Sequence, residues 1–121
     1  MRREDWRGRV MDILEAIDRI EGFIAGLDAE TFRRDRKARD AVVWNLTVVG
    51  EAARAVPDAL QARHPDVPWA KMRDTRNLLV HEYFGIDDDI VWATVTRNLL
   101  PLAPRLRELL SDPREALTDA Q

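Results

Sequence analysis

The stretch WRGRVMDILEAIDRIEGFIAGL, residues 6–27, decides the fold. Its apolar residues recur every three or four positions and so form one stripe along a helix: Val10, Ile13, Leu14, Ile17, Ile20, Ile24 and Leu27. Such a stripe has to be buried against other elements, while the charged residues between its members face solvent. The sequence therefore predicts an amphipathic helix over residues 6–27 that packs inside a larger helical domain.

Two further segments continue the same period. One predicts a long helix from about Arg36 to Val56, which Pro57 ends. The other predicts a last helix from Asp88 to Leu110, kinked at Pro101 and Pro104. The inward side of the first is expected to carry Ala38, Ala41, Val42, Asn45, Val48, Val49, Ala52 and Val56, with Gly50 permitting close helix packing.

The segments between these helices carry boundary signals. Residues 28–35 are expected to form a tight connection, with Asp28 placed as an N-cap. Residues 57–64 predict a short helix, and Pro68 suits the first position of a third main helix that reaches about His81. Gly85 and Asp87 then mark a break and a new N-cap. We expect an all-α, up-and-down four-helix bundle with an additional short helix.

Composition limits the classes of protein that fit. With 121 residues we predict a single domain over residues 1–121, with its core at about 6–110 and a frayed polar tail from Ser111. The absence of cysteine excludes a disulfide scaffold and a thiolate site, and with two histidines we expect no metal and no cofactor. No apolar run approaches a membrane span, so a cytoplasmic protein is expected. A net charge of -3 limits any RNA contact to a local site.

The most unusual polar stretch is RDTRNLLVHEY, residues 73–83, within and just after the third main helix. At about 100° per residue, Asp74, Asn77 and His81 share one helical face. Arg76 and His81 are about 140° apart, so they converge only through the long arginine side chain, an irregular last turn or a partner subunit.

These residue types suit phosphoryl chemistry. A histidine exchanges protons near neutral pH, and an arginine matches the geometry of a phosphate. RNA carries its own nucleophile, the 2′-hydroxyl, so a base and a cation are sufficient to cleave it without a metal. For an isolated pair, the commoner roles are a helix cap for His81 and an ion pair of Arg76 with Asp74 or Glu82.

A resemblance to a known family favours the catalytic interpretation of Arg76 and His81 over the structural one. The segment Arg76-Asn77-Leu78-Leu79-Val80-His81-Glu82-Tyr83 resembles the Arg-x4-His-x-Tyr motif of the HepT toxins in the HEPN superfamily. Residues 45–53, which include Gly50-Glu51-Ala52, are similar to the Gly-Glu-Ala segment of that family, and residues 84–92 are similar to the usual continuation of the motif. The resemblance covers roughly residues 6–110.

The resemblance implies a specific function. It implies a homodimeric, metal-independent endoribonuclease that acts as the toxin of a type VII-like toxin–antitoxin system, with Arg76 and His81 as the catalytic pair. Asn77, Asp74 and Glu51 would orient the site or contact the RNA substrate. An MntA-like nucleotidyltransferase antitoxin would transfer AMP to Tyr83, and the added bulk and charge would repel RNA. The alternative is a non-catalytic HEPN-type module that binds a nucleotidyltransferase or a nucleotide.

For several residues the sequence leaves two interpretations open. Glu51 could act in the site or pair with Arg54. The basic residues Arg33, Arg34, Arg36, Lys37 and Arg39 could contact RNA locally, although a solvated helix start is the commoner reason for such a cluster. His64 is expected at the surface. The four tryptophans are expected in the core or at a dimer interface rather than as platforms for bases: Trp6, Trp44, Trp69 and Trp92.

Overall fold

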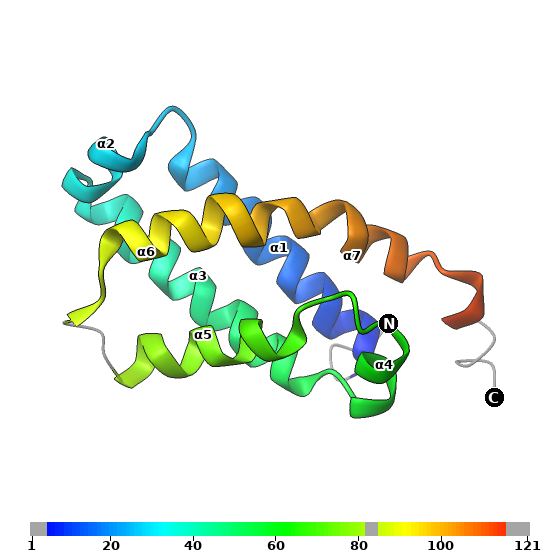
Figure 1. The fold of residues 1–121 in the computed structure, drawn as a ribbon. Coiled ribbons are helices and arrows are strands. Elements are labelled where there is room, and N and C mark those ends of the chain that lie inside the picture. Colours follow the sequence, from blue (N-terminus) through cyan, green and yellow to red (C-terminus); the bar gives the residue numbers. More distant parts are fainter. Residues whose placement is uncertain (1–4, 82–84, 116–121) are drawn as a thin grey trace.

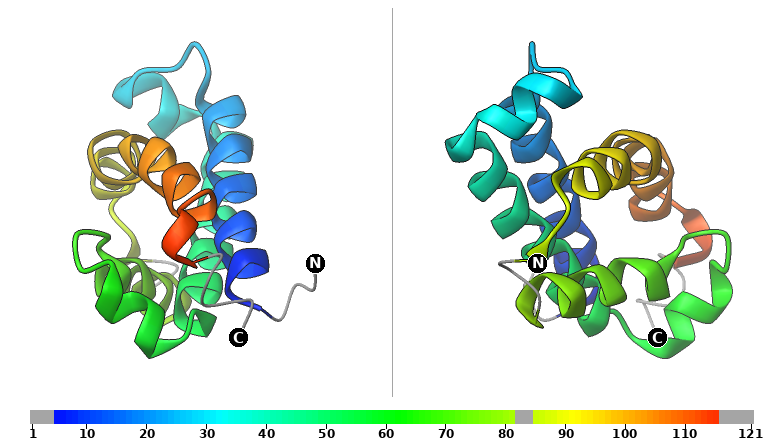
Figure 2. Two further views of the ribbon diagram at one scale, coloured as in Figure 1. Left: turned by 90° about the vertical axis from the view of Figure 1, so that its right-hand side faces the viewer. Right: turned by 60° about the vertical axis from the view of Figure 1, so that its left-hand side comes forward.

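Two long antiparallel helices form the centre of the protein. The computed structural model describes residues 5–81 and 85–115, without the side chains of residues 77–81. Helix α1 (Trp6–Ile24) packs along α3 (Arg36–Ala55), which in turn packs along α5 (Trp69–His81). Residues 88–110 form a further helical segment, called here the C-terminal rod, which lies across the α1–α3 pair on the same side as α5 (Figures 1 and 2). The prediction of an all-α bundle is confirmed.

Local signals set most of the helix ends. The Asp5 carboxylate accepts a hydrogen bond from the backbone N–H of Gly8 at the start of α1, and Asp35 does the same for Ala38 at the start of α3. Asp28 caps as predicted, but it begins a short helix, α2 (Ala29–Arg34), where we expected only a tight connection. Thr31 closes a capping box with Asp28, and this local gain explains the extra helix.

The other short helix and the break before the last rod follow the prediction. Helix α4 (Asp58–Arg63) follows Pro57, and Asp87 caps α6 (Asp88–Ala93). The rod continues as the π-helical η2 (Thr94–Leu99), the 3₁₀ turn η3 (Leu100–Leu102) and α7 (Ala103–Leu110). Pro101 and Pro104 lack the N–H groups that would bond the carbonyls four residues earlier, so irregular turns at this point are expected.

The core lies where the predicted stripes meet. Five of the seven predicted stripe residues of α1 are buried, as are Val42, Val49 and Val56 of the α3 segment. Leu106 and Leu109 close the core from α7. Leu14, Leu27, Ala41 and Val48 are only partly buried. Figure 1 shows the C-terminal rod lying over this pair of helices.

The tail differs from the prediction. We expected it to fray from Ser111, but the Glu115 side chain is buried and bonded to residues near α4. A carboxylate with cationic partners in the fold holds its segment in place, which a polar composition alone does not reveal. Residues 116–121 of the predicted tail lie outside the described residues.

Candidate functional site

Helices α3 and α5 approach most closely at Gly50 and Arg76. A Cβ atom added to Gly50 would overlap the Cβ of Arg76 and lie 3.0 Å from its Cα. Only glycine leaves room for this approach, which fixes the position of Arg76 relative to α3. The expectation that Gly50 permits close helix packing is confirmed.

Glu51 follows Gly50 and reaches the same arginine. Its Oε1 lies 2.5 Å from Nε of Arg76, while the two side chains are 49% and 28% exposed. This ion pair favours the first interpretation of Glu51, a place beside the motif arginine, over a pair with Arg54. Exposed pairs contribute only about 0–1 kcal/mol of stability. The pair therefore adds little to stability, although the Nε of Arg76 that makes it is itself buried.

The other residues of the predicted site are only partly placed. Asp74 is exposed on α5, about 200° around the helix from Arg76, so it does not join the Arg76–Glu51 pair. The helix includes Asn77 and His81, as predicted, but their side chains lie outside the described part. Tyr83 lies outside the described residues altogether.

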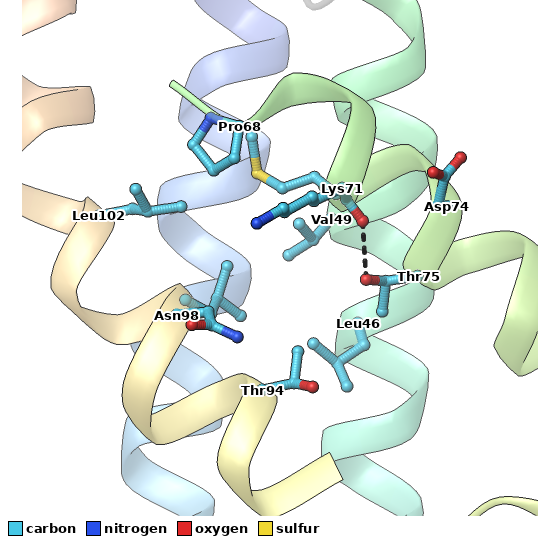
Figure 3. A pocket seen from close by; sticks show the side chains of 11 residues that line it. Leu46, Val49, Pro68, Lys71, Asp74, Thr75, Thr94, Asn98 and Leu102 are labelled. Carbon is cyan, nitrogen blue, oxygen red and sulfur yellow. Dashed lines mark hydrogen bonds between the residues drawn. The ribbon is translucent and has the colours of Figure 1, made fainter. Parts of the chain in front are cut away.

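A cavity of about 410 Å³ opens on the other side of α5 (Figure 3). Its floor is apolar and includes Leu46 and Val49 of α3, while α5 and η2 form its walls. Lys71 and Asn98 point into it from opposite walls, and the hydroxyl of Thr75 donates to the carbonyl of Lys71 at 2.8 Å. No local pattern predicted this cavity, because three separate segments form it.

His64 is part of a buried network and not of the surface as we expected. Its side chain is 2% exposed, and its Nε2 lies 2.8 Å from Oε1 of Glu115. On the other side of the ring, a guanidinium N–H of Arg105 faces Nδ1 at 3.1 Å. Arginine can only donate, so Nδ1 accepts and Nε2 carries the proton that His64 donates to Glu115.

Other groups complete this network. Arg63 donates two hydrogen bonds to Glu115, at 3.0 and 2.7 Å, and holds the pKa of that carboxyl down at about 2. The indole N–H of Trp69, at the start of α5, donates to the carbonyl of His64 at 3.0 Å. Both ring nitrogens of His64 and both oxygens of Glu115 have partners. The network therefore joins α4, α5, α7 and the tail and has a structural role.

The basic cluster around the start of α3 is largely paired. Arg33 bonds Asp89 at 2.5 Å, Arg34 bonds Glu30 at 2.7 Å, and the buried Arg39 bonds Asp88 at 3.0 Å. Arg36 and Lys37 are exposed. Two of the five residues, Arg33 and Arg39, therefore tie α2 and α3 to α6, and Arg34 pairs within α2, which favours a structural interpretation of these three over a contact with RNA.

Within residues 5–81 and 85–115, no group of three or more histidine and acidic side chains is placed to hold a metal ion. No described helix is long and apolar enough to span a bilayer.

Comparison with known proteins identifies the family. The model of the family described as Ribonuclease HepT-like matches residues 13–111. A protein of Thermococcus cleftensis named probable ribonuclease HepT is 37% identical over 98 residues, covering 81% of this chain and 89% of that protein. A putative RNase of Methanocaldococcus jannaschii is 33% identical over 112 residues, 93% of each chain. No solved structure matches the chain at a significant level.

These matches extend over most of the fold and include the α3–α5 contact. The chain belongs to the HepT-like ribonuclease family, within the HEPN superfamily. The resemblance stated from the motif around Arg76 is thereby confirmed, and so is the assignment to the RNA endonucleases at the level of the family.

Proposed function

We propose that this protein is a metal-independent endoribonuclease, the toxin of a type VII-like toxin–antitoxin pair, and that Arg76 and His81 are its catalytic residues. The observation that carries the proposal is the placement of Arg76. Gly50 holds this arginine against α3, where its Nε is buried beside Glu51, and the Arg76 side chain as a whole is 28% exposed. A permanent cation held in a fixed position suits a phosphate that gains charge during a reaction.

The chemistry follows from the nucleophile that RNA supplies. His81 accepts the proton of the 2′-hydroxyl, and the 2′-oxygen attacks the adjacent phosphorus. The bond from phosphorus to the 5′-oxygen breaks, and that oxygen takes up a proton. The products are a 2′,3′-cyclic phosphate and a 5′-hydroxyl end. Arg76 stabilises the negative charge on the crowded phosphate, and the reaction requires no metal ion.

The proposal includes a homodimer. On an ideal helix Arg76 and His81 point about 140° apart, so one α5 helix does not direct both side chains to one point. Two copies that bring their α5 helices to one cleft would supply an arginine and a histidine from different chains. Asn77, Asp74 and Glu51 would then border the substrate in this cleft.

The proposal also includes a nucleotidyltransferase partner that acts on Tyr83. Tyr83 follows His81 by two positions, so an attached AMP would carry a phosphate close to the catalytic histidine. Like charge repels the RNA backbone, which would switch the nuclease off. Coexpression with an MntA-like nucleotidyltransferase should add the mass of one AMP to the parent protein and none to Tyr83→Phe. Transfer at an undiminished level to the variant would contradict this assignment.

The nuclease itself is tested by incubating the purified protein, free of partner and with chelator, with a mixed RNA pool beside His81→Ala. Only the parent should cleave, with a rate about 100-fold or more above the variant. Both should unfold at the same temperature, because a residue beside a cleft contributes little to the core. Intact RNA in both samples, with Tyr83 shown unmodified by mass spectrometry, would favour the non-catalytic binding module.

A further inference from the structure

Trp44 differs from the other tryptophans of the chain. Trp6 and Trp69 are buried, and Trp92 packs against Phe32 with ring centroids 5.3 Å apart. Trp44 lies on α3 with 67% of its surface exposed. It was expected in the core or at an interface, and the structure removes the first possibility. An indole on the surface of a helix is accessible to a ligand or a partner.

A hollow of about 270 Å³ lies beside this indole. Trp44, Thr47, Val48 and Glu51 of α3 form one side of it, and Arg9 and Asp12 of α1 form the other. The hollow thus combines an aromatic face, an aliphatic side chain, hydrogen-bonding groups and a cation. Such a combination accepts a flat heteroaromatic ring that carries polar groups on its edges.

The position of the hollow relates it to the proposed catalytic arginine. Glu51 borders the hollow and also pairs with Arg76. Trp44 and Glu51 are seven residues apart, about 10 Å along the same face of α3. That distance corresponds to no more than about three stacked nucleotides at about 3.4 Å each. A strand whose phosphate contacts Arg76 can therefore place a neighbouring base at Trp44.

We propose that Trp44 and the hollow beside it bind an unpaired base of the RNA substrate, next to the phosphate that Arg76 contacts. The inference rests on the proposed nuclease function and adds a requirement to it. A base can stack on Trp44 only when it has left its own helix, so the substrate is single-stranded around the cut. Arg9, at the edge of the hollow, pairs with Asp12 at 3.9 Å, so it is not assigned a contact with the RNA backbone.

The surroundings of Trp44 favour RNA over a protein partner. The core of a protein interface is depleted of charged side chains. Around Trp44, the hollow contributes Arg9, Asp12 and Glu51, and Asp40 is exposed one helical turn before it. An exposed aromatic ring is a platform on which single-stranded nucleic acid stacks a base. Because the surroundings of Trp44 are net acidic, we place only the base in the hollow and the phosphate at Arg76.

The test compares Trp44→Ala with Trp44→Tyr on a single-stranded oligoribonucleotide that the parent cleaves. Stacking on an aromatic ring predicts that Trp44→Ala raises KM by about 10- to 100-fold, with kcat within about two-fold of the parent. Tyrosine also has an aromatic face, so Trp44→Tyr should restore KM to within a few-fold of the parent. Phe23→Ala is the control, because Phe23 is also exposed but lies about 20 Å from Arg9 along α1.

Two results would overturn the inference about Trp44 and leave the nuclease proposal intact. An unchanged KM in Trp44→Ala, while the parent cleaves and His81→Ala does not, would show that Trp44 holds no base. A change in sedimentation of Trp44→Ala toward a smaller species would place Trp44 at a protein interface instead.

A second measurement separates this inference from the proposed function. A single-stranded oligoribonucleotide with 2′-O-methyl groups has no nucleophile for cleavage, so its binding is measured independently of catalysis and of whether the parent cleaves the unmodified strand. If the parent cuts no RNA, the nuclease proposal fails, and this binding still decides about Trp44. Binding to Trp44→Ala weakened about 10-fold or more supports the stacking site. Equal binding by parent and variant overturns it.

Discussion

The two ends of α5 hold their charged side chains in different ways. At its first residue, the indole N–H of Trp69 donates to the carbonyl of His64. The ring of His64 lies between Glu115 and Arg105, and His64 and Glu115 are 2% and 1% exposed. Toward the other end, Arg76 pairs with Glu51 through a buried Nε, but the two side chains as a whole are 28% and 49% exposed. Charges that are buried with several partners fix a structure, whereas a partly exposed pair can exchange one anion for another.

This comparison also separates the two histidines. His64 is buried with both ring nitrogens bonded, so it is not available to a substrate. His81 belongs to the end of α5 that carries the proposed catalytic arginine. We therefore expect changes at one end of α5 to affect activity and changes at the other to affect stability.

The largest expected effect is that of Gly50→Ala on activity. The new methyl group would overlap the Cβ of Arg76 and push α5 away from α3. A displacement of about 1 Å at a catalytic group can cost about 100-fold in rate. Overpacking of this kind destabilises a protein by about 1–3 kcal/mol. Cleavage assays and thermal unfolding measure the two effects.

Gly22→Ala is the matched control, because it lies within α1 and a Cβ atom there would meet nothing within 4 Å. It should keep full activity and raise stability slightly, by about 0.5–1 kcal/mol. Equal activity of Gly50→Ala and the parent would show that the close approach at Arg76 is not required for catalysis.

The next effect is that of Glu115→Ala on stability. Removing this carboxylate leaves the buried N–H of His64 without its acceptor, and we expect a loss of about 3 kcal/mol in the free energy of unfolding. Activity at a temperature where both proteins are folded should stay near that of the parent. Glu108→Ala, an exposed glutamate on α7, is the control and should change stability by less than about 0.5 kcal/mol.

The Glu115 carboxylate also makes the stability of the protein depend on pH. The pKa of Glu115 is lowered from 4.5 to about 2, chiefly by Arg63, so its stabilisation is complete above about pH 4.5 and lost as the pH falls toward 2. The difference in stability between the parent and Glu115→Ala should shrink across this window. A constant difference from neutral pH down to pH 2 would contradict the low pKa.

The sequence predicted the parts that depend on local or periodic signals. The bounds of α3 and α5 follow from apolar spacing and from prolines at positions 57 and 68, and the caps at Asp28 and Asp87 were found. Helix α1 begins at Trp6 as predicted but ends at Ile24, three residues before the predicted Leu27, because Gly26 takes a positive φ of 79° that an α-helix does not use. Helix α2 was missed because six mostly polar residues carry too short a pattern to distinguish a helix from a connection.

Contacts between distant segments could not be predicted in the same way. Glu51 has Arg54 within one turn of its own helix, yet it pairs with Arg76, 25 positions away. His64 stands between an arginine and a proline, which is typical of a surface turn, and its partner Glu115 is 51 positions away. Nothing in the sequence near either residue indicates these partners, because the packing of whole helices brings them together.

The π-helical segment Thr94–Leu99 has a consequence for comparing relatives of this protein. A π turn inside an α-helix contains one more residue than the α-helical turn that it replaces. Relatives in which this helix is regular should therefore be one residue shorter between positions 94 and 99. An alignment without a gap at that point would rotate the residues directly after Leu99 by about 100° around the helix axis, before the tighter 3₁₀ turn Leu100–Leu102 changes the winding again.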